Sequence, residues 1–363
     1  MRKLASIRRI DGLYPIPDRD KIELAQIDGW TVIVKKDEFK VGDLCVYIEI
    51  DSVLPEKPEF EFLRSKNFRI KTMKMAGCIS QGICFPLDIL PTDREYAFDD
   101  DVTDILGIKK FEPQDATDVK EPKEKEAVIN RYPAFLMRYK FFRNLFYKFG
   151  NKKKVKAFPE FISKTDETRI QNAPFYLDLD EEWVVTEKID GQSGTFAVVK
   201  KKRLFKTTYE YIVCSRNVRL FKKDDSSYWK VSEKYNIEEK LTNFLKENKK
   251  IDWIAIQGEC ISPKVQGNKY KVKEPDLFIF NVIFPRGRIG SISGKEFVES
   301  LGMKFVPIIG EMKLPKTVPE MLEIAHGNSA LGNTIREGLV CRSFDGKKSF
   351  KAVDPLFLIK YNE

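Results

Sequence analysis

A break in pattern between residues 96 and 160 separates two parts of the chain that both have strand-like sequence. Before the break, short runs of β-branched and aromatic residues are punctuated by turns at Asp11, Asp28 and Gly42. After it, strand-like runs alternate with helix-like runs. At roughly one domain per ~150 residues, the 363 residues are enough for two or three domains. We therefore predict an α+β protein with a domain boundary on each side of the break.

The first part, residues 1–95, has the pattern of a small antiparallel barrel. Short strands at this spacing, with Lys and Arg between them, favour an N-terminal OB-fold β-barrel, which commonly presents a basic, aromatic face to nucleic acid. A β-barrel with no ligand of its own is the alternative. The predicted strands are residues 22–27, 30–34, 44–50 and 83–87.

The connector, residues 96–160, differs in composition from both neighbours. Its segment 131–156 is basic, and its apolar residues recur at spacings of three and four, which predicts a helix. Core packing explains these apolar residues, while the intervening Arg and Lys side chains can face a phosphate backbone. The formal net charge of the whole chain is +9, which favours a polyanionic partner. The apolar positions are Phe135, Leu136, Tyr139, Phe142, Leu145, Phe146 and Phe149.

Composition excludes several classes of protein. The six cysteines contain no Cys-x-x-Cys pair, which argues against a zinc ribbon or a disulfide framework and favours a reducing, cytoplasmic or nuclear setting. No apolar run is long enough to cross a membrane, and the N-terminus lacks a signal-peptide core. The single histidine, His326, argues against His-dependent zinc hydrolases and Ser-His-Asp catalysis. We expect His326 to bond the last carbonyls of a helix, and Lys, Arg, Asp and Glu to carry the chemistry.

The last part, residues 161–363, is predicted to form antiparallel sheets with flanking helices. Three helix starts carry capping signatures, Asn236 with Glu239, Ser293 with Glu296, and Thr317 with Glu320. Gly302 and Gly327 stand where helices should stop. The predicted strands are residues 183–189, 195–199, 209–214, 253–259, 277–283, 339–342 and 349–353.

The sharpest local feature is the sequence Glu-Lys-Ile-Asp-Gly at residues 187–191, which follows a β-branched run. Residues two apart in a strand share a face, so Lys188 and Asp190 can point into one cleft. An amine nucleophile needs its free base, and neighbouring cations or a bound metal lower the pKa of a lysine towards that state. An acidic neighbour raises the pKa unless it is occupied with the metal. The tetrapeptide Lys-x-Asp-Gly within this sequence also occurs in simple hairpin turns.

Further motifs follow this one in a fixed order. They are residues 215–217, 257–259, 278–281, 337–342 and Lys351. Together they resemble the ordered motif set of the covalent nucleotidyltransferases, which are the polynucleotide ligases and mRNA capping enzymes. The chain ends about a dozen residues after Lys351, whereas DNA ligases and capping enzymes normally carry an OB domain there. With the barrel first, and with residues 70–73 and 80–82, the chain resembles the ATP-dependent RNA ligase 5 family over its whole length.

The resemblance implies a reaction and the residues that perform it. Lys188 is the nucleophile, which attacks the α-phosphorus of ATP, expels pyrophosphate and holds AMP through a phosphoramidate bond. Asp190 matches the position that holds metal-bound water and orients the lysine. Glu259 and Glu337 match two carboxylates that bind Mg²⁺ or Mn²⁺ through its waters, and Glu259 also matches a contact to the ribose.

The same resemblance assigns the nucleotide contacts. Arg216 matches the arginine that contacts the sugar or phosphate, and Lys351 grips the α-phosphate. Phe280 stacks on adenine, with Phe278 as the alternative, and Val340 covers the opposite face of the ring. Glu187 and the adjacent backbone read the adenine amino group.

One position departs from the family pattern. Many ligases place a second lysine two residues after the first in the final motif, where this chain has Val353. Either neutralisation of the α-phosphate is weaker here or another cation supplies it. Lys360 is near in sequence but has no assigned role.

The resemblance implies an enzyme that seals 3′-OH and 5′-phosphate ends and whose partner is RNA, in a nicked duplex with an RNA 3′-OH strand. We expect the enzyme to be a monomer. Two alternatives remain open. One is a capping guanylyltransferase that uses GTP, and the other is an OB-type RNA-binding protein whose ligase-like half is inactive. The intact residues Lys188, Asp190, Glu259 and Glu337 argue against the inactive protein.

Overall fold

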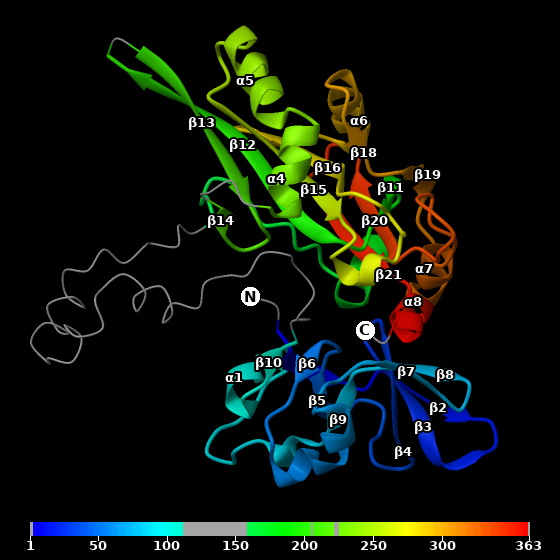
Figure 1. Cartoon of the computed structure of the whole chain (residues 1–363). Helices are drawn as coiled ribbons and strands as arrows, with labels where there is room; N and C mark the ends of the chain where they lie inside the picture. Colours follow the sequence, from blue (N-terminus) through cyan, green and yellow to red (C-terminus); the bar gives the residue numbers. More distant parts are fainter. Residues whose placement is uncertain (1–2, 112–157, 205, 221–224, 362–363) are drawn as a thin grey trace, which may run out of the picture.

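The computed structural model describes residues 3–111, 158–204, 206–220 and 225–361, which form two strand-rich halves joined at one side (Figure 1). The α+β class predicted from the sequence is confirmed. The helix predicted within 131–156 lies outside the described residues. No helix in the ranges given above is long and apolar enough to span a membrane.

The N-terminal half is built from short antiparallel strands that curl around one core. Two three-stranded sheets run in the orders β1-β5-β9 and β2-β3-β4, and two smaller pairs complete the half. All four strands predicted from the sequence are present, and β1, β2 and the β7–β8 hairpin were missed. The elements are β1 (Ala5–Arg9), β2 (Gly12–Ile16), β3 (Arg19–Ile27), β4 (Trp30–Lys35), β5 (Leu44–Ile48), β6 (Ser52–Val53), η1 (Pro58–Lys66), β7 (Thr72–Met75), β8 (Cys78–Gln81), β9 (Ile83–Phe85), η2 (Leu87–Ile89), α1 (Thr103–Leu106) and β10 (Lys109–Lys110).

The C-terminal half has two sheets. The larger has the order β14-β13-β12-β15-β16-β17, and β18 pairs with β16 in parallel. The smaller has the order β19-β11-β20-β21 and is antiparallel throughout. Its strands are β11 (Glu182–Lys188), β19 (Ile308–Lys313), β20 (Gly338–Ser343) and β21 (Ser349–Val353). The larger sheet contains β12 (Gln192–Arg203), β13 (Lys206–Cys214), β14 (Arg219–Leu220), β15 (Trp253–Ile261), β16 (Asp276–Phe284), β17 (Gly287–Arg288) and β18 (Lys304–Phe305).

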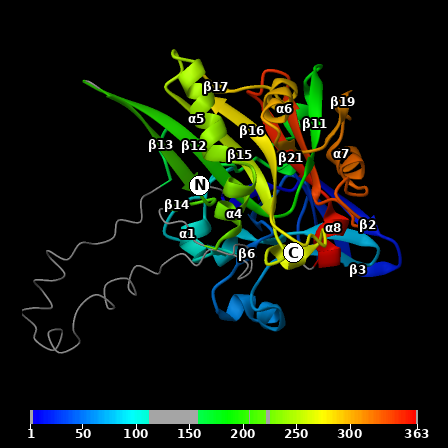
Figure 2. The same cartoon turned by 45° about the horizontal axis from the view of Figure 1, so that its top comes forward.

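Helices cover one face of each sheet and leave the other faces to meet. Apolar residues of α4, α5 and α6 pack on the larger sheet, and α7 packs on the smaller one (Figure 2). Helix burial on the outer faces leaves the inner faces to line a common space. The helical elements are α4 (Ser227–Lys234), α5 (Ile237–Glu247), α6 (Ser291–Ser300), α7 (Val318–Ala325), α8 (Pro355–Tyr361), η4 (Ile170–Asn172), η5 (Pro174–Asp178) and η6 (Gln266–Asn268).

The predicted helix caps met different outcomes. Thr317 and Glu320 form the reciprocal capping box of α7, as predicted. The cap predicted at Ser293 is wrong, because α6 already begins at Ser291 after Gly290. Asn236 precedes α5, but its side chain makes no capping hydrogen bond and its backbone is left-handed, with φ of 50°. Gly302 follows α6 with φ of 64°, a conformation that favours glycine.

Apolar packing and hydrogen bonds join the two halves. Val353, Phe357 and Leu358, at the end of the chain, belong to the same buried cluster as the barrel core. The indole nitrogen of Trp30 also donates to Asn172 Oδ1 at 2.6 Å. The last strand and helix of the C-terminal half are therefore packed against the N-terminal half.

Candidate active site

Strand alternation sorts the side chains of the small sheet into two sets. Leu339 and Cys341 of β20 are buried under α7, so their neighbours Val340 and Arg342 lie on the inner face. The register pairs Val340 with Thr186 on one side and with Lys351 on the other. Lys188, two residues beyond Thr186, lies on the same inner face. The predicted nucleophile and the predicted phosphate-binding lysine therefore share one surface.

Lys188 lies among carboxylates at the end of β11. Its Nζ contacts Oε2 of Glu337 at 2.5 Å. Burial alone would lower the pKa of Lys188, but the charges of Glu337, Glu259 and Asp190 outweigh it and raise the pKa above its ordinary value. Burial also raises the pKa of Glu259 to about 8, despite the opposing effect of Lys188. Without a further cation, the amine is held in its protonated form.

Asp190 is fixed by a pair of residues that sequence reasoning missed. The buried ammonium of Lys269 forms an ion pair with the carboxylate of Asp190, and the backbone N–H of Asp190 donates to the Tyr270 hydroxyl at 2.8 Å. The same ammonium lies over the rings of Phe357 and Tyr361 in α8. Lys269 and Tyr270 follow η6 in a stretch without helical or strand periodicity, so only the tertiary fold reveals this contact.

Lys351 and Arg216 meet at a fourth acid, Asp166. Asp166 accepts from Lys351 Nζ at 3.1 Å and pairs with Arg216 Nη2 at 3.2 Å. Burial would raise the pKa of Asp166, but these two cations hold it well below its usual range. Burial and the neighbouring Arg169 lower the pKa of Lys351 to about 8.

Arg169 is a second cation beside Lys351 that sequence reasoning missed. Its backbone bridges to Lys351, and its buried side chain donates to Asp51 of the N-terminal half at 3.2 Å. Within the described part of the chain, its Nε and Nη1 have no hydrogen-bond partner.

Two of the predicted base contacts can be compared directly. A register shift in the β15–β16 pair follows Gln257, and the Phe280 ring lies 5.9 Å from the Arg342 guanidinium on the small sheet. Phe278 instead lies under the ammonium of Lys304, at 5.4 Å. Phe280 is thus the phenylalanine that faces Val340 and its strand.

The side chain of Glu187 is engaged elsewhere. It is buried, and its carboxylate accepts from the Ser329 hydroxyl at 2.5 Å and the Ala330 N–H at 2.9 Å. This carboxylate anchors the loop before β20. The predicted contact of the Glu187 side chain with adenine is not supported, because both carboxylate oxygens already accept hydrogen bonds from the loop before β20.

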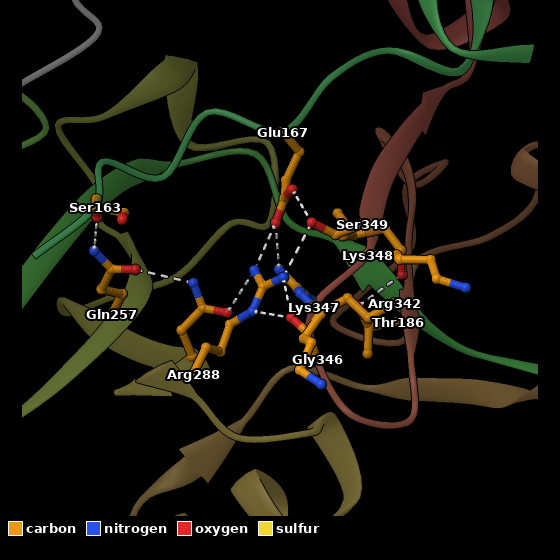
Figure 3. A network of polar contacts seen from close by, with 12 residues as sticks. Ser163, Glu167, Thr186, Gln257, Arg288, Arg342, Gly346, Lys347, Lys348 and Ser349 are labelled. Atoms are coloured by element: carbon orange, nitrogen blue, oxygen red, sulfur yellow. Dashed lines mark hydrogen bonds and ion pairs between the residues drawn. The ribbon is translucent and has the colours of Figure 1, made fainter. Parts of the chain in front are cut away.

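A buried polar network joins strands of the two sheets (Figure 3). Its centre is Glu167, which accepts from Arg288 at 3.2 Å, Arg342 at 3.1 Å and Ser349 at 2.5 Å. Burial would raise the pKa of Glu167, but the two arginines and the Ser349 hydroxyl lower it. One carboxylate therefore serves two guanidinium groups, and the network carries excess positive charge.

The charges around Lys188 fit a divalent cation. Asp190, Glu259 and Glu337 bring three carboxyl groups to the two ammonium groups of Lys188 and Lys269, and a bound cation would favour the ionised form of Glu259, whose pKa is otherwise raised. The described ranges contain no group of three or more His, Cys, Asp or Glu side chains placed to chelate a metal directly. The donor set suits Mg²⁺ or Mn²⁺, which prefer oxygen ligands and keep several waters.

Comparison with known proteins agrees with this geometry. A family model described as RNA ligase matches residues 181–360, and one described as an OB-fold domain matches residues 4–87. An RNA ligase variant from Naegleria gruberi, solved with AMP and Mn, is 31% identical, with a TM-score of 0.80 and 98% of each chain covered. The chain belongs to the RNA ligase family. A second Naegleria gruberi variant, solved with ATP and Mn, is also 31% identical, with a TM-score of 0.80 and 100% of both chains covered. No curated protein matches this RNA ligase.

The fold thus brings together most of the residues selected from the sequence of this RNA ligase. Lys188, Asp190, Glu259 and Glu337 form one cluster, and Arg216 and Lys351 share Asp166. Val353 is a core residue, 2% exposed, and Lys360 lies beside the Tyr361 ring.

Proposed function

We propose that this RNA ligase uses ATP to seal 3′-OH and 5′-phosphate RNA ends, in nicked duplexes, through a covalent lysyl-AMP on Lys188. The observation that carries the proposal is the position of the Lys188 amine, which lies at the last residue of β11 and is surrounded by three carboxyl groups. The Naegleria relatives solved with ATP or AMP and Mn support ATP as the nucleotide and a divalent cation as its companion.

We assign the binding of nucleic acid and the transfer of AMP to different parts of the chain. We assign nucleic-acid binding to residues 1–95 and to the basic connector 96–160, and adenylyl transfer to residues 161–363. Contacts with phosphates make such binding sensitive to salt. The six free cysteines support a cytoplasmic or nuclear location, and we take the enzyme to act as a monomer.

Asp190, Glu259 and Glu337 would hold Mg²⁺ or Mn²⁺. When bound, the cation stabilises the free amine of Lys188 and offsets negative charge at the phosphate. Lys269 keeps the Asp190 carboxylate in place for this role, since it is the ion-pair partner of that group.

In the first step, Lys188 Nζ loses one proton to solvent to become the free amine. Nζ then forms a bond to the α-phosphorus of ATP and releases a second proton to solvent, while the bond from that phosphorus to the bridging oxygen breaks. Pyrophosphate leaves with the electron pair. Lys351 neutralises the α-phosphate, and Arg216 contacts the sugar or phosphate once Asp166 yields to the ligand. Such catalysis consists mainly of positioning and charge neutralisation.

Arg169 can compensate for the second lysine that the final motif lacks at Val353. It lies beside Lys351 and lowers the pKa of that lysine, so its charge acts at the same place. Two of its guanidinium nitrogens have no partner among the described residues. We propose that Arg169 supplies the second cation that other ligases take from a lysine at the Val353 position.

In the later steps the AMP passes from Lys188 to the 5′-phosphate of an RNA strand. A 3′-OH then attacks that phosphorus, forms the phosphodiester bond and releases AMP. Phe280 and Val340 would hold the adenine between them throughout, which keeps the nucleotide in one orientation.

Incubation with α-labelled ATP and Mg²⁺ or Mn²⁺ tests the proposal. We expect the wild-type protein to acquire a label that is stable to denaturation, and Lys188→Ala to acquire none. Lys360→Ala is the matched control, because it removes a lysine outside the cluster and should label normally. A label retained by Lys188→Ala contradicts the assignment of the nucleophile.

The nucleotide and the substrate are tested in parallel. Labelling by GTP and not by ATP would indicate a guanylyltransferase, and RNA binding without any adduct would indicate an inactive binding protein. Matched nicked duplexes with RNA or DNA on either side of the nick then define the strands. We expect sealing to require RNA on the 3′-OH side.

A further inference from the structure

Two arginines of the network in Figure 3 share the Glu167 carboxylate but differ in how fully they are bonded. Arg288 uses all of its side-chain nitrogens. Its Nε and Nη2 donate to the Gly346 carbonyl at 2.9 and 2.6 Å, its Nη2 also reaches Ser349, and its Nη1 reaches Glu167 and Asn281. This saturated side chain has a purely structural explanation.

Arg342 is bonded at one nitrogen. Its Nη2 donates to Glu167 at 3.1 Å, whereas its Nε and Nη1 have no hydrogen-bond partner within the described ranges. The residue is only 3% exposed. Leaving donors of a buried charged group unpaired is costly, so such a group in a native site indicates a missing acceptor.

The position of Arg342 indicates what the acceptor is. It shares the inner face of β20 with Val340, and its guanidinium lies 5.9 Å from the Phe280 ring. These are the two residues proposed to enclose the adenine. Glu167 and Arg288 line a cavity of about 370 Å³ on one side of the network, and Arg342 is not among its lining residues.

The phosphate is too far away to be this acceptor. Lys188 pairs with Gly338, and Arg342 lies four residues further along the same strand. At ~3.4 Å per strand residue, this separation is about 14 Å along the sheet. A phosphorus bonded to Lys188 stays at the other end of the cleft, so the part of the nucleotide that reaches this depth is the base.

We propose that Arg342 is a specificity-determining residue that donates through Nε and Nη1 to a ring nitrogen of adenine, N1 or N7, with Glu167 holding it in place. The proposal rests on the lysyl-AMP function described above. It adds a base contact made by a side chain of β20. The excess positive charge of the network suits an acceptor atom and disfavours a donor at the same place.

Analogues that lack one acceptor test the contact. The full-length protein is given ATP, 1-deaza-ATP or 7-deaza-ATP, and kcat/KM for lysyl-AMP formation is measured. We expect one analogue to react roughly 10- to 100-fold more slowly than ATP with the wild-type enzyme, the loss that an unpaired buried donor produces. Failure of the wild-type protein to label with ATP would refute the proposed function itself and is a separate result.

Variants then show which residue reads the missing atom. In Arg342→Met, kcat/KM for ATP should fall to about the value that the wild-type enzyme shows with the sensitive analogue. Because the contact is already lost, kcat/KM for that analogue should be nearly the same in the variant as in the wild type. Arg288→Met is the matched control, because it removes a network arginine whose donors are saturated; it should keep the wild-type preference for ATP over the analogue. If the methionine variant does not fold, Arg342→Lys replaces it in the test. The lysine ammonium can keep the bond to Glu167 but cannot also donate to the base, so the same loss of preference for ATP is expected.

Three results would overturn the proposal. They are equal rates for ATP and both analogues in the wild type, an undiminished preference for ATP over the analogue in the Arg342 variants, and loss of that preference in Arg288→Met. The last result would mean that the network as a whole, and not Arg342, shapes the site.

Discussion

The two ends of the cleft hold their charges differently. At the phosphate end, Lys351 and Arg216 are paired with Asp166, a residue whose side chain is 46% exposed. At the base end, Glu167, Arg288 and Arg342 are largely buried. Arg288 donates to the Gly346 carbonyl, and Glu167 accepts from Arg342 and from the Ser349 hydroxyl. Acid and base can exchange partners at the first end, whereas the second end is fixed before any ligand arrives.

This difference follows from what each end does. Phosphates change charge and position during transfer of AMP, so the groups around them must release one partner and accept another. A base stays in one place through all steps, and a preorganised site loses less free energy on binding. The predictions below test this contrast, from the largest expected effect to the smallest.

Glu337→Gln should cause the largest loss. Glu337 contacts Lys188 directly and is a proposed metal carboxylate. Removing one electrostatic stabiliser at a reacting centre costs roughly 10²- to 10³-fold in rate. Single-turnover formation of lysyl-AMP measures the effect, and Glu311→Gln, at an exposed position of β19, should behave as wild type. Unchanged adenylylation in Glu337→Gln would show that Glu337 takes no part in the transfer of AMP to Lys188.

Lys269→Met should reduce adenylylation by roughly 10- to 100-fold, the range typical of residues that orient a metal-site carboxylate. It leaves Asp190 without its buried ion-pair partner. The reduction should shrink as Mn²⁺ concentration rises, because the cation can restore the position of Asp190. Lys273→Met, at an exposed position in the same loop, is the control. A loss that excess Mn²⁺ leaves unchanged argues against this role.

Lys351 should take up a proton when ATP binds. Burial and Arg169 lower its pKa to about 8 in the free enzyme, and phosphate contacts favour the charged form and raise the pKa. Uptake should therefore be near zero at pH 6 and reach about half a proton at pH 8, rising above that. Calorimetry in EDTA, in buffers of different ionisation enthalpy, measures it. Lys351→Met should abolish the uptake, and uptake that persists there would assign it to another group.

Asp166→Asn should have the smallest effect and the opposite direction. It frees Lys351 and Arg216 from a competitor for the phosphates. Partly exposed ion pairs contribute about 0.2–1 kcal/mol, so the KM for ATP should fall by roughly 1.5- to 5-fold. A KM that rises instead would show that Asp166 orients these two cations for the nucleotide.

Local pattern explains what the sequence predicted correctly. The strands predicted at residues 183–189, 339–342 and 349–353 are present as β11, β20 and β21. Their register places Lys188, Val340 and Lys351 on one face. The Thr317 capping box was also found, because its signal lies within four residues.

What the sequence missed depends on contacts between distant segments. Asp166, Glu167 and Arg169 lie in a stretch with little regular structure, and their partners are more than a hundred residues away or in a different sheet. Lys269 likewise reaches back 79 residues to Asp190. No periodicity marks such residues, and their roles become visible only when the fold brings them to the cleft.

The packing of Val353 and α8 into the barrel core gives the C-terminus a mechanical role. Lys351 and Val353 both lie on β21, and Val353 is buried in the barrel core. We therefore expect a displacement of the barrel to move Lys351, the proposed phosphate-binding lysine. A chain cut before residue 158 would expose Phe357 and Leu358 to water and free that strand at the same time. Loss of the barrel should therefore loosen the hold on ATP even though the nucleophile and its carboxylates remain.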